Sequence, residues 1–158
     1  MTKPELLAKI IAHLQAELSM LTAAALATHA EATDEENKAE DKYDTRGLEA
    51  SYLAHGQSKA AEEAALALAQ FQTIVPRAFL PTEPISVGAL ITLQGPERNY
   101  YFIGPRAGGM EISHGEQPVL VITPQSPLGR HLMGRIQGET LAIDLGGKRR
   151  SVIIESVV

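Results

Sequence analysis

The chain has 158 residues, 44% of them hydrophobic, and can therefore bury one compact core or two small ones. It contains no cysteine, which excludes disulfides, thiolate zinc sites and cysteine nucleophiles. The net charge of −5 lies entirely in residues 1–78, which hold 12 acidic and 7 basic side chains, because residues 79–158 hold 7 of each. An acidic first half is unsuited to following a phosphate backbone, so we expect it to meet protein or metal.

The first residues have neither the apolar core nor the small-residue cleavage site of a secretory signal. No apolar run approaches the roughly 18 residues of a membrane span. We therefore expect a cytoplasmic protein with no membrane partner.

Proline and glycine divide the chain into two halves. From Glu5 to Val75 there is no proline and there are only two glycines, whereas from Pro76 onward eight prolines and eleven glycines separate short apolar runs. This shift predicts a helical domain over residues 1–78 and a strand-rich domain over residues 79–158, that is, an α+β protein.

Two apolar stripes in the first half follow alternating spacings of four and three residues, which is the pattern of a coiled-coil seam. They predict an antiparallel helical hairpin with its turn near Glu31 to Gly47. An ordinary helical bundle is the alternative. The first stripe is Leu7, Ile11, Leu14, Leu18, Leu21, Ala25 and Thr28, and the second, read backward, is Val75, Phe71, Leu68, Ala64, Ala61, Gln57, Ala54 and Ala50.

Carboxylates crowd the expected turn, and most such charge runs are solvated surface. A second interpretation is that some of them are hard oxygen ligands, suited to a magnesium ion that keeps several waters. Held at the end of a long hairpin, they could complete a two-metal phosphoryl site that belongs to another protein. The acids are Glu31, Asp34, Glu35, Glu36, Glu40, Asp41, Asp44 and Glu49.

The second half contains five short apolar or alternating runs, which predict a small sheet. The predicted strands are Leu90 to Leu93, Tyr100 to Ile103, Val119 to Ile122, Thr140 to Leu145 and Ser151 to Val157. Gly146-Gly147 predicts a hairpin between the last two strands. Between the third and fourth, Ser126 can cap a short helix that Pro127 begins and Gly134 ends.

The segment around this helix carries the most specific motif of the chain. Ser126-Pro127-Leu128-Gly129-Arg130, followed by Leu132, Gly134 and Gly138-Glu139, resembles the Ser-Pro-Ile/Leu-Gly-x-x-Leu-x-Gly-Lys pattern of the GreA/GreB transcript-cleavage factors. The resemblance implies that a coiled-coil hairpin precedes an FKBP-like domain, that the hairpin enters the secondary channel of RNA polymerase, and that the domain holds the channel rim. It also implies that Ser126, Pro127, Leu128, Gly129 and Arg130 contact the polymerase. The alternative is a purely structural strand-to-helix connection.

The expected tip departs from the family pattern. Gre factors carry Asp-Leu-x-Glu-Asn-Ala-Glu-Tyr, and the nearest match here runs from Asp44 to Tyr52, with Gly47 where the second acid stands if Asp44 takes the place of the first. The resemblance implies that Asp44 assists catalysis in trans. Asp41, Glu40 and Glu49 are candidates for the missing acid because they lie near Asp44 in the sequence. Asp44 and Asp41 would then hold a Mg²⁺ shared with the polymerase.

On this interpretation the chain is an accessory factor and not an enzyme. It would bind RNA polymerase as a monomer, contact nascent RNA and DNA only indirectly, and promote cleavage of backtracked transcripts. One alternative is a Gre homologue that occupies the channel and inhibits, which the missing second acid favours. Another is an FKBP-like binding module or prolyl isomerase, which the 4% aromatic content and lack of tryptophan disfavour.

The only basic run, Lys148-Arg149-Arg150, follows the Gly146-Gly147 turn. Charges at a hairpin edge commonly discourage sheet-to-sheet pairing. An electrostatic contact with acidic polymerase surface or with nascent RNA is the alternative. Added salt would weaken such a contact.

Overall fold

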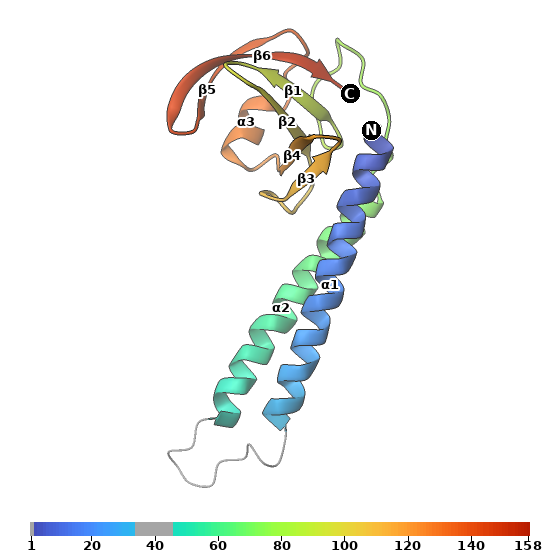
Figure 1. The fold of residues 1–158 in the computed structure, drawn as a ribbon, viewed down its shortest axis with the longest axis vertical. Helices are drawn as coiled ribbons and strands as arrows, with labels where there is room; N and C mark the ends of the chain where they lie inside the picture. Colours follow the sequence, from blue (N-terminus) through green and yellow to red (C-terminus); the bar gives the residue numbers. More distant parts are fainter. Residues whose placement is uncertain (1, 34–45) are drawn as a thin grey trace. The chain divides into compact units, whose positions relative to one another are not determined.

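The protein is α+β, with two long helices followed by a six-stranded sheet and one short helix (Figure 1). The computed structural model describes residues 2–33 and 46–158, and the side chains of residues 2–31 and 55–158. Two compact units are present: Ile11–Ala69 form one, and Met1–Ile10 together with Gln70–Val158 form the other. Below, the second of these is called the sheet unit. These units follow proximity in the structure, whereas the predicted division after residue 78 follows composition.

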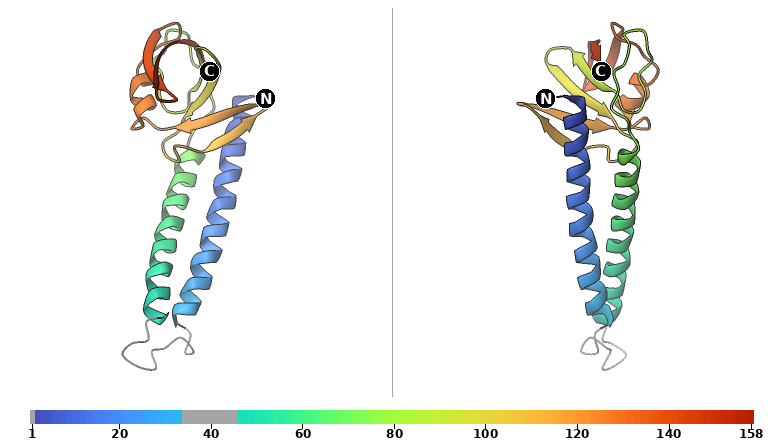
Figure 2. Two further views of the ribbon diagram at one scale, coloured as in Figure 1. Left: turned by 60° about the vertical axis from the view of Figure 1, so that its left-hand side comes forward. Right: turned by 90° about the vertical axis from the view of Figure 1, so that its right-hand side faces the viewer.

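The first unit is a helical hairpin, which confirms the prediction. Helix α1 spans Lys3–Thr33 and helix α2 spans Arg46–Gln72. The two helices lie side by side in every view (Figure 1, Figure 2). Most of the predicted turn, residues 34–45, lies outside the described residues.

Burial along the helices follows the predicted stripes in part. In α1 every stripe member is buried or half-buried, but the two most buried side chains, Leu6 and Ile10, were not predicted. In α2, Ala64 is buried, and the neighbouring buried Ala67 was not predicted. Small side chains at these positions allow two helices to approach closely. The prediction was wrong at one end of the second stripe, because α2 ends at Gln72 and leaves Val75 76% exposed.

Helix α1 has one property that we did not expect from its apolar runs. The stretch Lys3–Glu31 is 29 residues long and contains an 18-residue window with a mean hydropathy of 1.4, so by length and composition it could cross a membrane. Helices of soluble proteins and N-terminal signal sequences share these values, so the property alone does not indicate a membrane protein. Part of it comes from Met20 and Leu26, which are more than 60% exposed.

The sheet has the strand order β3-β4-β2-β1-β6-β5, with β2 parallel to β4 and the other neighbours antiparallel. All five predicted strands are confirmed. The prediction missed β3, which has a single large apolar residue, Ile112. The strands are β1 (Leu90–Gln94), β2 (Arg98–Ile103), β3 (Glu111–His114), β4 (Gln117–Ile122), β5 (Thr140–Leu145) and β6 (Lys148–Val157).

Two apolar layers flank the sheet. On one face, alternate strand residues such as Ile103, Ile143 and Ile154 form the main core together with Leu132 of the short helix α3 (Pro127–Leu132). On the other face, Phe102 stacks against Phe71 at the end of α2, with the ring centroids 6.3 Å apart. The predicted Gly146-Gly147 hairpin is confirmed, and both glycines have positive φ, 60° and 78°, as a type I′ turn requires.

Candidate functional site

Helix α3 begins with a complete N-cap. Ser126 has extended backbone angles, φ −65° and ψ 154°, and its Oγ accepts a hydrogen bond from the Gly129 N–H at 3.0 Å. The same hydroxyl donates to the main-chain oxygen of Thr123 at 2.8 Å. Pro127 occupies the first turn, where its missing N–H has no helical partner to lose. The predicted capped helix is confirmed, and Ser126 holds the end of β4 and the start of α3 together.

Gly129 is required by close packing. A Cβ at this position would lie 1.8 Å from the main-chain oxygen of Thr123 and 2.8 Å from Ser126 Oγ. No side chain larger than hydrogen fits without moving the backbone. Ser126 and Gly129 therefore shape the loop, and Gly129 is buried.

The remaining three residues of the motif differ in exposure. Leu128 is half-buried and packs against the main core, whereas Pro127 and Arg130 are exposed. Arg130 Nε donates to the main-chain oxygen of Gln125 at 2.8 Å, so the guanidinium is fixed against the loop that precedes the helix. Of the five predicted contact residues, Pro127 and Arg130 present the most surface to a partner. That role stays a prediction.

The β5–β6 hairpin adds cations to the same side of the sheet. Val152 and Ile154 of β6 face the main core, and strand alternation places Lys148 and Arg150 on that face too. Arg149 lies on the opposite face, in register with Asp144. The acid in β5 is therefore opposite Arg149 and not Lys148 or Arg150.

Acidic groups are scarce around α3. No aspartate or glutamate occurs from Ile122 to Gly138, and Glu139 accepts from Arg135 at 3.4 Å and from the Ile136 N–H at 2.6 Å. We call the exposed basic residues Arg130, His131, Lys148 and Arg150 the α3 face. The basic run and the Ser126 motif are far apart in the sequence, and only the strand register shows that Lys148 and Arg150 lie on the same side of the sheet as α3.

The acidic candidates cannot be placed in this way. Glu40, Asp41 and Asp44 lie outside the described residues, and Glu49 is on α2 in the part whose side chains are not described. Among the residues that the structure describes, no three histidine, aspartate or glutamate side chains come together to hold a metal. The assisting acids and the Mg²⁺ that Asp44 and Asp41 would share stay predictions.

Comparisons with known proteins give structural likeness alone. No protein-family model matches the chain, and no curated protein matches it. Solved structures of Gfh1, a GreA factor homologue, resemble it. The Thermus thermophilus protein is 19% identical over 94% of both chains with a TM-score of 0.38, and the Thermus aquaticus protein is 20% identical over 99% and 96% with 0.39.

A GreA/GreB elongation factor from Nitrosomonas europaea is 18% identical, with a TM-score of 0.37, over 70% of this chain and 91% of that one. These identities and scores are low. We therefore take no residue role from them.

Proposed function

We propose that this chain is a Gre-like transcription elongation factor that binds RNA polymerase at the secondary channel. The observation that supports this most is the motif from Ser126 to Arg130, which forms a capped turn with Pro127 and Arg130 at the surface. The motif follows a helical hairpin in the chain, which is the order of parts that its resemblance to Gre factors implies. Residues 79–158 would form the FKBP-like domain that binds the polymerase in the cytoplasm.

The basic side chains of the α3 face indicate which kind of partner surface would fit it. Lys148 and Arg150 have no ion-pair partner among the described residues, and Arg130 contacts a main-chain oxygen alone. Such cations fit an acidic protein surface, because complementary charge raises the rate of encounter and fixes orientation. Binding should therefore weaken as salt is added.

The hairpin would bring its acidic turn to the polymerase active centre. There Asp44, with Asp41, Glu40 or Glu49, would hold a water and promote hydrolysis of the backtracked transcript by the polymerase itself. A Mg²⁺ shared by Asp44, Asp41 and the polymerase would supply Lewis-acid activation of that water. The chain would then be an accessory factor that acts as a monomer, and its contact with RNA and DNA would be indirect.

A second candidate function is channel occupation without cleavage. One feature of the sequence favours it: Gly47 stands where the second acid of the Gre tip would be when Asp44 is aligned with the first. A factor of this kind would bind the same surface of the polymerase and slow it. An FKBP-like binding module or isomerase has less support, because the aromatic content is only 4%.

Transcript cleavage by a purified, backtracked RNA polymerase elongation complex distinguishes these functions. The proposal predicts faster cleavage with the wild-type chain and a loss of that stimulation in Asp44→Ala. Glu62→Ala is the matched control, since it removes one exposed acid from α2 away from the turn. Binding of the chain to the elongation complex without faster cleavage would favour channel occupation. Absence of binding would reject both polymerase functions.

A further inference from the structure

A pocket of about 530 Å³ lies within the sheet unit, away from the α3 motif. The first residues of α1, the segment that follows α2, and the ends of the sheet surround it. Its walls are mainly apolar and include Pro4, Pro76 and Leu90, and two cations, Lys3 and Arg77, line it with His114 of β3. No residue of the α3 face lines it, so polymerase binding through that face leaves this pocket without a role.

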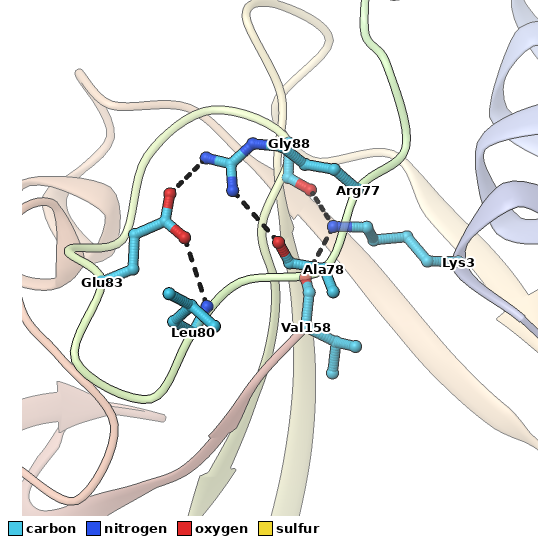
Figure 3. A network of polar contacts seen from close by, with 7 residues as sticks. All are labelled: Lys3, Arg77, Ala78, Leu80, Glu83, Gly88 and Val158. Atoms are coloured by element: carbon cyan, nitrogen blue, oxygen red, sulfur yellow. Dashed lines mark hydrogen bonds and ion pairs between the residues drawn. The ribbon is translucent and has the colours of Figure 1, made fainter.

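Lys3 is held in place at the pocket with one donor to spare. Its Nζ donates to the main-chain oxygens of Gly88 at 3.1 Å and Val158 at 2.8 Å (Figure 3). The residue is only 8% exposed. Because an ammonium group has three N–H donors, one remains for a ligand.

Arg77 is the second fixed cation. Its Nη2 pairs with Glu83 Oε1 and its Nη1 donates to the main-chain oxygen of Ala78 at 3.1 Å (Figure 3). The guanidinium also lies over the ring of Phe79, 4.1 Å from its centroid, and Lys3 Nζ lies 4.7 Å from the same centroid. Two positive charges therefore share one aromatic ring.

Glu83 is the acidic side chain beside these two cations. Glu83 accepts from Arg77 and from the Leu80 N–H at 3.2 Å, and it makes no hydrogen bond to Lys3. Burial, and then the nearby charge of Arg77, lower the pKa of Lys3 to about 8, so Lys3 is still mostly protonated at pH 7. Both cations are therefore charged at neutral pH.

His114 adds a polar atom that has no partner. Its Nδ1 is buried and makes no hydrogen bond within the described residues. Because solvent does not reach this atom, it is not open to a ligand in the pocket. The two cations supply the few polar groups that orient a ligand in an otherwise apolar pocket.

We propose that this pocket binds a small organic carboxylate with an apolar body. The carboxylate accepts from Lys3 and Arg77, and the body packs against Pro4, Pro76 and Leu90. The volume lies within the roughly 300–1,000 Å³ range of small-molecule sites. Apolar walls disfavour inorganic phosphate and nucleotides, which need polar groups on every side.

The test compares 1-naphthoate with its neutral analogue 1-naphthamide by isothermal titration calorimetry at pH 7, using the full chain. We expect saturable 1:1 binding of naphthoate, at least about tenfold tighter than that of the amide, because charge-assisted hydrogen bonds are the stronger kind. Equal affinities, or no binding of naphthoate, would overturn the proposal.

Two variants locate the site. Arg77→Gln should weaken naphthoate binding at least about tenfold. Its matched control is Arg98→Gln, which breaks another exposed arginine–glutamate pair of the same unit, with Glu155 at 2.6 Å, and should leave binding unchanged. Ala78→Phe fills the pocket, keeps both cations and should abolish binding. Equal effects of the two arginine variants, or binding that survives Ala78→Phe in the folded protein, would refute the assignment.

Discussion

Replacing Gly129 by alanine tests the packing that shapes the α3 motif. Gly129 lies in a helix, where alanine is normally favoured over glycine by about 1 kcal/mol. Propensity alone therefore predicts a more stable protein. The structure predicts the opposite, because the added methyl carbon would lie 1.8 Å from the main-chain oxygen of Thr123.

The size of the effect follows from what must move. Non-bonded contacts of a Cβ are essentially never shorter than 3.0 Å, so the helix and the Thr123 carbonyl would have to separate by more than 1 Å. That shift would break the two Ser126 Oγ hydrogen bonds of 2.8 and 3.0 Å. Overpacking costs roughly 1–3 kcal/mol and a lost N-cap about 1 kcal/mol. Because the obstacle is backbone, which cannot rotate away, we expect a net destabilisation of about 3 kcal/mol.

Urea-induced unfolding measures this change. Near-ultraviolet circular dichroism reports on the sheet unit through the buried Tyr101, and far-ultraviolet circular dichroism reports mainly on the long helices. Gly56→Ala is the control, since Gly56 is also helical but has nothing within 4 Å of the position that an added methyl would take, and it should stabilise the protein. If Gly129→Ala were as stable as wild type, the close approach to Thr123 would not be a constraint.

Three further predictions concern other parts of the molecule. Gln57→Leu should stabilise the hairpin by about 1 kcal/mol in a thermal melt, because the buried Oε1 of Gln57 has no hydrogen-bond partner among the described residues; an unchanged or lower Tm would contradict this. Gly104→Ala should destabilise the sheet unit by roughly 1–3 kcal/mol in urea, since its Cβ would lie 2.6 Å from Phe71 Cζ, and a neutral effect would show that this ring moves freely. The difference between the free energies of unfolding of wild type and Lys3→Met should increase between about pH 8 and about pH 10.4. Folding lowers the pKa of Lys3, so in this range Lys3 is protonated in the unfolded chain and largely neutral in the folded one. A difference that stays flat or falls would contradict this.

Local patterns were enough to predict most secondary structure. The helices and five strands follow from apolar spacing, and the cap at Ser126 follows from Ser-Pro at the start of a helix. Strand β3 was not predicted because Ile112 is its only large apolar residue. Its pairing with β4 is made by the backbone, and no side-chain pattern marks it in the sequence. The predicted stripe extends too far at Val75. The residue before a proline is disfavoured in a helix, so Pro76 could have predicted an earlier helix end from the sequence alone.

Long-range features could not be read from spacing. The resemblance to Gre factors pointed to Gly129 as a contact residue, but its proximity to the Thr123 carbonyl is visible only once β4 and α3 are packed. The orientation of Lys148 and Arg150 depends on the register of β6 against β5. The pocket joins Lys3, Arg77 and His114, which come from three distant segments, and no local pattern links them.

The most direct test of the proposed function is the affinity of the chain for purified RNA polymerase, measured by fluorescence anisotropy with variants of the α3 face. The proposal predicts saturable binding that weakens at least about tenfold in Arg130→Glu, because one cation of the contact is reversed. Arg149→Glu is the matched control, since Arg149 lies on the opposite face of the sheet in register with Asp144, and it should bind like wild type. No binding of the wild-type chain, or an equal loss in both variants, would contradict polymerase recognition through the α3 face.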